Sequence, residues 1–252
     1  MLKKFIDVLS NGMCGGSRLR QEHLNRLDLM RNRTTTRTAA GILLAALMQL
    51  WSLSVIAATL QVKVLDVDGE PVPDVAVFVE QEGVAQHAGT PEAAVMDQRN
   101  RRFVPHVLVV QKGAKVAFPN SDVIAHHVYS FSKPNNFALP LYKGTPPEPV
   151  RFDHPGIVTL GCNIHDSMLA YIVVVDTDRF GKTGDDGVVE IEVDPDAEGW
   201  RVHAWSPRFR DARGPLAQTV RAGQSPSVTF QLQKKLRPAH GEETESVFWD
   251  DY

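Results

Sequence analysis

The chain has 252 residues, 43% of them hydrophobic, which is enough for one or two packed domains. Its formal net charge is −3, but residues 59–252 hold 19 Lys/Arg and 27 Asp/Glu, a charge of −8. A body of this charge is repelled by nucleic acid and by anionic lipid, so neither is expected as a partner, and a basic partner protein suits it better.

Residues 1–58 are predicted to be a targeting segment that forms a signal helix. Three arginines, Arg31, Arg33 and Arg37, precede an apolar run over residues 39–58. The run ends in small residues, as a signal peptidase requires. This pattern predicts export to the periplasm.

Counted from Met1, the basic region before the apolar run is too long for an ordinary signal peptide, whereas counted from Met30 it has a normal length. We therefore expect translation to start at Met30; the alternative is that residues 1–29 are translated but take no part in the fold. The alternative to cleavage is an uncleaved membrane anchor, since an apolar run of about 20 residues is long enough to span a bilayer. Contact with a membrane is expected only in that second case.

The chain contains two cysteines, Cys14 and Cys162. Cys14 lies in the segment expected to be removed, which leaves the exported body with a single thiol. Such a thiol cannot form an internal disulfide, and in an oxidising compartment it is either a hazard or put to use. This favours Cys162 as a metal ligand.

The body beyond residue 58 has the patterning of β-structure. Apolar residues alternate with polar ones over residues 60–64, 75–79, 189–193 and 228–232, which is typical of half-buried strands. Residues 103–110 form a further strand candidate. Many short strands separated by Gly, Pro and Asp turns predict an all-β protein built of β-sandwiches.

A short segment brings together three side chains that bind soft metals. Cys162, His165 and Met168 occur within seven positions, between apolar runs at residues 157–160 and 168–175. A tight loop between two strands can direct all three at one ion. Two His, one Cys and a weak axial Met make the trigonal copper site of blue-copper proteins, so a second His is needed from elsewhere.

The segment that follows Phe118 offers this histidine. A strand candidate ends at Phe118, a polar turn with Asn120 follows, and His126 begins the next strand. From here to the Cys-x-x-His-x-x-Met loop, over about residues 95–176, the chain resembles the cupredoxins, and the loop has the short spacing typical of amicyanin.

The resemblance implies a Greek-key cupredoxin β-sandwich with one type 1 copper ion. The ligands that it implies are His126, Cys162, His165 and Met168. Cupredoxins of the plastocyanin type usually have Asn after the first ligand His, but His127 stands there in this chain. Neighbouring side chains of a strand point to opposite faces, so only one of the pair can face the metal. The offset from Phe118 favours His126, and His127 remains the alternative.

A narrower resemblance is carried by residues 103–105, 120–122, 126–132 and 161–166. These segments are similar to a bacterial family labelled methylamine-utilization proteins, which has a predicted cupredoxin domain and an export signal. The label implies a gene context rather than a reaction.

The flanks resemble a carboxypeptidase-regulatory-like, transthyretin-type β-sandwich. Residues 64–73 are similar to its first hairpin, and residues from Asp185 to Pro207 are similar to later strands. The resemblance implies a cupredoxin domain inserted in, or packed on, a transthyretin/Ig-like sandwich. The expected parts of the chain are a targeting segment over residues 1–58, a flanking domain over 59–90 and 177–235, a copper domain over 91–176 and a flexible tail over 236–252.

The function expected from these features is one-electron transfer by a periplasmic copper protein, with a redox protein, best a basic one, as its partner. A closed four-ligand site leaves no position for a substrate, so the chain is not expected to be an enzyme unless Met168 fails to bind. The rivals are copper delivery and an interaction module in which the metal serves structure. Zinc suits these ligands less well. The remaining alternative is a buried Cys and Met with an incidental His.

Overall fold

The computed structural model describes residues 58–82, 90–133, 135–144, 148–210, 214–221 and 227–239. These ranges contain strands and loops but no helix, so the predicted all-β class is confirmed. No helix among them is long and apolar enough to cross a membrane. The predicted signal helix, up to Ala57, and the end of the predicted tail, residues 240–252, lie outside the described residues.

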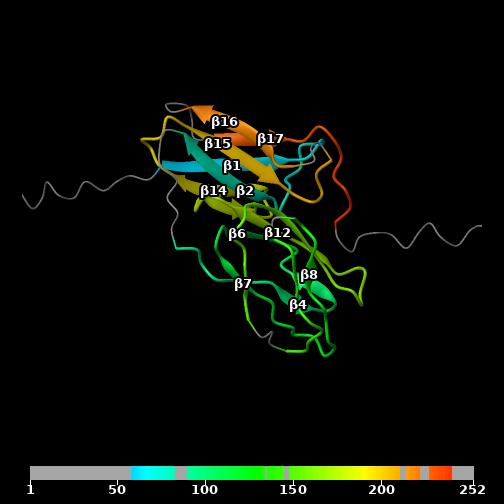
Figure 1. The fold of residues 1–252 in the computed structure, drawn as a ribbon. Coiled ribbons are helices and arrows are strands. Elements are labelled where there is room, and N and C mark those ends of the chain that lie inside the picture. Colours follow the sequence, from blue (N-terminus) through cyan, green and yellow to red (C-terminus); the bar gives the residue numbers. More distant parts are fainter. Residues whose placement is uncertain are drawn as a thin grey trace, which may run out of the picture. The chain divides into compact units, whose positions relative to one another are not determined.

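Strands from both flanks of the sequence form one sandwich, here called the flanking sandwich (Figure 1). Its two sheets have the orders β14-β1-β17 and β13-β2-β15-β16. The strands are β1 (Ala58–Leu65), β2 (Ala76–Glu82), β13 (Phe180–Lys182), β14 (Val188–Val193), β15 (Gly199–Trp205), β16 (Leu216–Arg221) and β17 (Ser227–Gln231).

The alternating sequence of β1 explains its place between two neighbours. Leu60, Val62 and Val64 are fully buried, whereas Gln61 and Lys63 are exposed. The buried side chains of β1 share one core with those of β2, β14, β15 and β17, so the two sheets pack face to face. β1 pairs antiparallel with β14 and parallel with β17.

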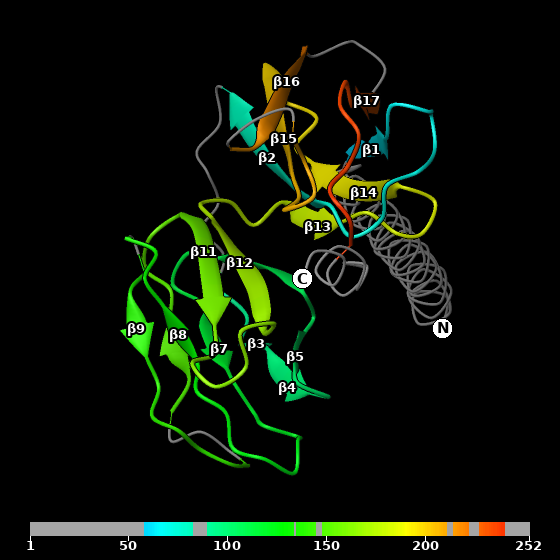
Figure 2. The same ribbon diagram turned by 90° about the vertical axis from the view of Figure 1, so that its right-hand side faces the viewer.

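The middle of the sequence forms the central sandwich (Figure 2). A five-stranded sheet has the order β6-β12-β11-β8-β9, a three-stranded sheet has the order β10-β7-β3, and β4 pairs with β5. The strands are β3 (Ala94–Val95), β4 (Asp97–Arg99), β5 (Arg102–Val104), β6 (Val107–Gln111), β7 (Lys115–Ala117), β8 (Tyr129–Ser130), β9 (Phe137–Ala138), β10 (Val150–Arg151), β11 (Gly156–Gly161) and β12 (Leu169–Val175).

One predicted strand is divided in two. The sequence predicts a strand over residues 103–110, but β5 ends at Val104 and β6 begins at Val107. Pro105 lies between them, and a proline nitrogen carries no hydrogen for a β-ladder. β6 then pairs in parallel with β12, which places it in the sheet that carries the Cys162 loop.

The central sandwich leaves and rejoins the flanking sandwich at one pair of strands. β13 pairs antiparallel with β2, with Phe180 opposite Phe78. A cluster of buried side chains from β2, β6, β12 and β15, with Trp205 its largest member, connects the two sets of strands. The Lys182 ammonium also donates a hydrogen bond of 2.9 Å to the Val107 carbonyl oxygen.

Candidate metal centre

A hairpin loop carries three of the predicted ligands. β11 and β12 are antiparallel neighbours, and their last pair is Gly161 opposite Leu169. Seven residues therefore connect the strands, and Cys162 is the first of them and Met168 the last. Two turns shape the loop, and the Met168 backbone N–H donates a 2.9 Å hydrogen bond to the His165 carbonyl oxygen. The fold thus compresses the Cys-x-x-His-x-x-Met spacing into a tight loop.

The backbone of His126 is fixed by a short bridge to Tyr142. The His126 N–H donates to the Tyr142 carbonyl oxygen at 2.9 Å, and the Tyr142 N–H donates to the His126 carbonyl oxygen at 3.0 Å. The Asn120 side-chain amide donates to the carbonyl oxygens of Ile124 and Tyr142. The predicted polar turn before His126 is therefore closed by its own asparagine.

The structure brings His126, Cys162 and His165 together. Their candidate ligand atoms all lie within 4.8 Å of one another. The Cys162 sulfur is 4.0 Å from His165 Nδ1, and the ring centroids of the two histidines are 4.9 Å apart. Residues from two loops distant in the sequence thus converge on one point.

Asp122 fixes the orientation of the His126 ring. A carboxylate oxygen of Asp122 lies 2.7 Å from His126 Nε2, which assigns the ring proton to Nε2. The other ring nitrogen, Nδ1, is buried and has no hydrogen-bond partner. An unpaired buried acceptor costs free energy, and a metal ion would satisfy its lone pair.

Asp122 is itself held by a turn of the backbone. Its carboxylate accepts the N–H groups of Asn100 at 2.6 Å and Arg101 at 2.9 Å, both in the left-handed region of φ. Burial raises the pKa of Asp122, but the hydrogen bonds from Arg101, the His126 ring and Asn100 outweigh it, and the pKa is lower than the ordinary 3.8. Asp122 is therefore a carboxylate at neutral pH and a strong acceptor for the His126 ring.

Met168 and His127 differ in their placement. Met168 is 1% exposed and belongs to the same buried core as Cys162. His127 is half-buried, lies outside the cluster of candidate ligand atoms, and has its ring centroid 5.6 Å from that of Tyr129. His126 is fully buried and its neighbour His127 is not, as expected if the side chains of adjacent residues point to opposite faces.

Tyr142 and Gln98 support the site without having been identified from the sequence. The Gln98 amide donates to the Tyr142 hydroxyl, and this hydroxyl donates to the Phe118 carbonyl oxygen. Burial, together with the charges of Asp97 and Cys162, raises the pKa of Tyr142 to about 12 despite the Gln98 hydrogen bond. The phenol therefore stays protonated at neutral pH and continues to hold the end of β7.

Gly161 allows a ring to pack directly under the loop. A Cβ atom at this position would lie 2.8 Å from the Tyr129 ring, closer than any ordinary contact. Gly161 also pairs with Tyr129 across β11 and β8. The glycine before Cys162 thus permits the close approach of the strand next to His127.

These donors fit copper by their chemistry. Cys162 supplies a soft thiolate, and two imidazoles suit Cu(I) and Cu(II). The orphaned Nδ1 of His126 and the free, buried thiol of Cys162 are both directed into one cluster. Met168, in the same core, is the remaining soft donor.

No family model matches this chain, and no curated protein matches it either. The solved structures similar to part of it include a copper-containing nitrite reductase from Thermus scotoductus SA-01, with 26% identity and a TM-score of 0.31 over 38% of this chain. The similar part spans only 25% of the reductase chain.

Two other similar structures are cupredoxins matched over nearly their whole length. A purple cupredoxin from Nitrosopumilus maritimus is 17% identical, with a TM-score of 0.28 over 32% of this chain and 99% of its own. A mutant amicyanin in its reduced Cu(I) form is 22% identical, with a TM-score of 0.30 over 39% of this chain and 98% of its own.

Proposed function

We propose that this protein binds one copper ion as a type 1 site and carries single electrons. The ligands are His126, Cys162 and His165, with Met168 as the weak axial ligand. The observation that supports this most is the convergence of a buried thiol and two imidazoles within 4.8 Å, one of them with an unpaired, buried Nδ1. When bound, copper supplies a one-electron couple between Cu(I) and Cu(II).

The protein's contribution is a fixed set of donors. Cys162 and Met168 begin and end a loop that is closed by a backbone hydrogen bond and anchored by two paired strands. His126 is oriented by Asp122 and pinned by Tyr142. Donors that do not move favour electron transfer, because little rearrangement accompanies a change of charge at the site.

His165 is the proposed route for the electron. His126 is 0% exposed and Cys162 is 3% exposed, whereas His165 is half-buried and reaches the surface. Ile164 beside it is 52% exposed, which gives a partner protein an apolar contact next to the ring. We expect the redox partner to dock there, and four protein ligands leave no position for a substrate, so no enzymatic activity is proposed.

The setting of this function is also part of the proposal. We infer export to the periplasm from the basic and apolar residues 1–58, with a mature chain that starts near Thr59. The flanking sandwich is proposed to be a carboxypeptidase-regulatory-like module, and the gene context that of methylamine-utilization proteins. Amino-terminal sequencing of periplasmic and membrane fractions tests export, and an intact N-terminus in membranes would contradict it.

The absorption spectrum of the Cu(II)-loaded protein tests the proposed site. We expect an intense thiolate-to-copper band in the visible, and we expect Cys162→Ser to abolish it because a hydroxyl is a poor donor at neutral pH. His127→Ala is the matched control and should keep the band. A Cys162→Ser variant with the same band would disprove the assignment, and a colourless protein that prefers zinc would favour a structural metal.

Voltammetry separates electron transfer from copper delivery. The proposed carrier should cycle reversibly and keep its copper when mixed with an apo metal-binding competitor. A delivery protein would lose its copper to the competitor and show no reversible wave. Both measurements should use one preparation, so that the same molecules give both answers.

A further inference from the structure

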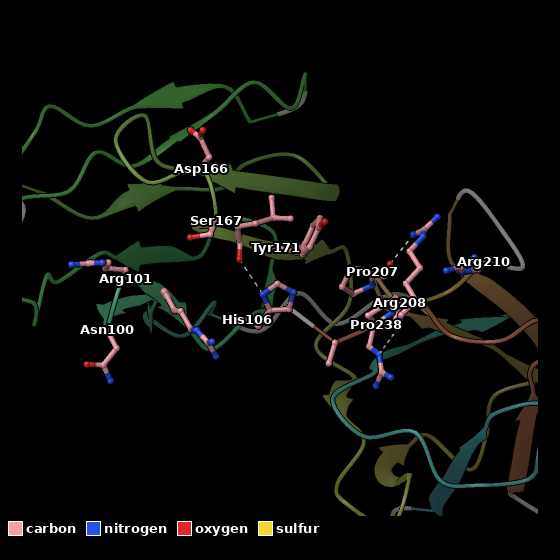
Figure 3. Close-up of a pocket in the computed structure, with 14 residues that line it drawn as sticks. Asn100, Arg101, His106, Asp166, Ser167, Tyr171, Pro207, Arg208, Arg210 and Pro238 are labelled. Atoms are coloured by element: carbon pink, nitrogen blue, oxygen red, sulfur yellow. Dashed lines mark hydrogen bonds between the residues drawn. The ribbon is translucent and has the colours of Figure 1, made fainter. Parts of the chain in front are cut away.

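Beside the candidate metal centre lies a pocket of about 860 Å³ lined by five arginines, here called the arginine pocket (Figure 3). Arg101 and Arg102 come from the turn between β4 and β5 and the start of β5. The remaining three, Arg208, Arg210 and Arg237, come from segments that follow β15 and β17. In Figure 3, Arg101 lies at one end of the pocket and Arg208 and Arg210 lie at the other, with Tyr171 between them.

The charge of this pocket is opposite to that of the rest of the body. Residues 59–252 have a formal charge of −8, yet the pocket has five arginines and one acidic residue, Asp166, in its lining. Among the described residues, the ion pairs involve other cations, and none joins a carboxylate to these five arginines. Positive charge is thus concentrated in one concavity, where the described residues offer the five arginines no carboxylate in an ion pair.

Both ends of the pocket are held in place by hydrogen bonds. At one end, Arg208 Nε donates to the Arg237 carbonyl oxygen at 3.0 Å, and Arg237 Nη1 donates to the Pro207 carbonyl oxygen at 2.7 Å. At the other end, the Arg101 N–H donates to Asp122. The arginines therefore extend from segments of defined position, which lowers the entropy lost when a ligand binds.

We propose that the arginine pocket binds a small anion that carries two or more oxyanion groups, carboxylates or phosphates. Guanidinium groups bind such groups through paired, charge-assisted hydrogen bonds. Because arginines lie at both ends, a ligand with two separated groups can engage both. The volume is that of a small-molecule site, which favours a compact ligand over an acidic polypeptide.

The pocket adjoins the ligand loop of the metal centre. Asp166 and Ser167, which lie between His165 and Met168, contribute to its lining. Arg101 lines it as well, and its backbone N–H holds the carboxylate that orients His126. A bound anion would thus lie against the loop and the turn that position the metal ligands, although the binding itself does not rest on the proposed function.

Calorimetric titration of the metal-free chain with pyrophosphate and with citrate tests the proposal. We expect saturable binding of at least one of these probes, weakened about tenfold or more by the double substitution Arg102→Gln/Arg210→Gln. The matched control is Lys63→Gln/Lys115→Gln, which removes the same charge at exposed positions outside the pocket and should leave the affinity within about twofold. Arg102→Lys/Arg210→Lys should retain part of the affinity, because lysine keeps the positive charge but lacks the paired, planar N–H donors of a guanidinium.

Thermal unfolding shows whether the variants are still folded. The anion should raise the melting temperature of the unsubstituted chain but not that of the Arg102→Gln/Arg210→Gln variant, and without anion the two should unfold alike. Equal loss of affinity in the arginine and lysine pairs would overturn the proposal, since net charge alone would then explain binding. Binding of a glutamate-rich peptide but of neither probe would overturn it in favour of an acidic polypeptide. Cys162→Ser should bind the anion unchanged, so failure of the copper site and failure of this pocket are distinguishable.

Discussion

The flanking and central sandwiches differ in the side chains that fill their cores and in the lengths of their strands. The flanking core contains only aliphatic and aromatic side chains, while every sulfur atom of the described residues lies in the central core. The flanking strands β1, β2 and β15 have seven or eight residues, but β8, β9 and β10 have two each. Strand length does not set where the donors lie: the loop from Cys162 to Met168 extends from β11 and β12, the longest strands of the central sandwich, whereas His126 lies just before the two-residue β8.

The largest effect is expected from the loss of a proposed copper ligand in the central sandwich. His126→Ala should lower copper affinity by more than about a hundredfold, because losing a mere orienting partner of a ligand already costs ten- to a hundredfold. Competitive titration with a copper chelator measures this. His127→Ala is the control and should change affinity by only a few fold. A larger loss of copper affinity in His127→Ala than in His126→Ala would assign the ligand role to His127 instead.

The next effect concerns the flanking core. Leu60→Ala should destabilise the protein by about 2–5 kcal/mol, since Leu60 is fully buried between the two sheets. Denaturant unfolding gives this value. The visible spectrum of the copper-loaded, folded fraction should stay unchanged. A changed spectrum would show that the flanking sandwich shapes the metal site directly.

A smaller effect is expected from the carboxylate that orients His126. Asp122→Asn should weaken copper binding by about ten- to a hundredfold, because an amide holds the ring less strongly than a carboxylate does. Asp153→Asn, which removes an exposed carboxylate paired with Arg151, serves as the control in the same titration. Equal copper affinities in the two variants would show that Asp122 does not support copper binding.

Substitution of Met168, the proposed axial ligand, should affect the reduction potential more than the copper occupancy. Met168→Gln is expected to retain copper and to lower the reduction potential, because an oxygen donor favours Cu(II) over Cu(I). Voltammetry of the variant and the unsubstituted protein measures the difference. A higher potential, or complete loss of copper, would show that Met168 has another role.

The smallest effect probes the close packing under the ligand loop. Gly161→Ala should cost about 1–3 kcal/mol of stability, since the added methyl group forces the Tyr129 ring to move. Chemical denaturation of the metal-free protein provides the number. Gly214→Ala is a suitable control, because a Cβ atom there meets nothing within 4 Å. Similar losses of stability in Gly161→Ala and Gly214→Ala would mean that the Tyr129 ring can move aside at no cost in free energy.

Much of this architecture follows from local patterns in the sequence. The alternation over residues 60–64 predicts β1, and its buried and exposed residues are those observed. The spacing from Cys162 to Met168 predicts a tight loop, which the structure contains. Such features are encoded by neighbouring residues, so a period or a spacing suffices to find them.

Other parts of the site depend on contacts between distant segments. Asp122 stands four residues before His126 in a polar turn, a spacing that could have suggested its role, but its bonds to Asn100 and Arg101 come from another hairpin. Tyr142 joins the site through its backbone bridge to His126 and through hydrogen bonds with other distant residues, none of which a local sequence pattern predicts. Likewise, the arginines of the pocket are spread from Arg101 to Arg237, so only the fold reveals that they share one concavity.

The pairing of β1 with β17 has a mechanical consequence. These are the first and last strands of the described fold, and they lie parallel, so tension between the start of β1 and the end of β17 pulls them past each other along their length. All hydrogen bonds of that ladder then resist together. The central sandwich is attached between β2 and β13, so it carries none of the load while the ladder holds. The candidate metal centre is thereby shielded from a pull on the chain.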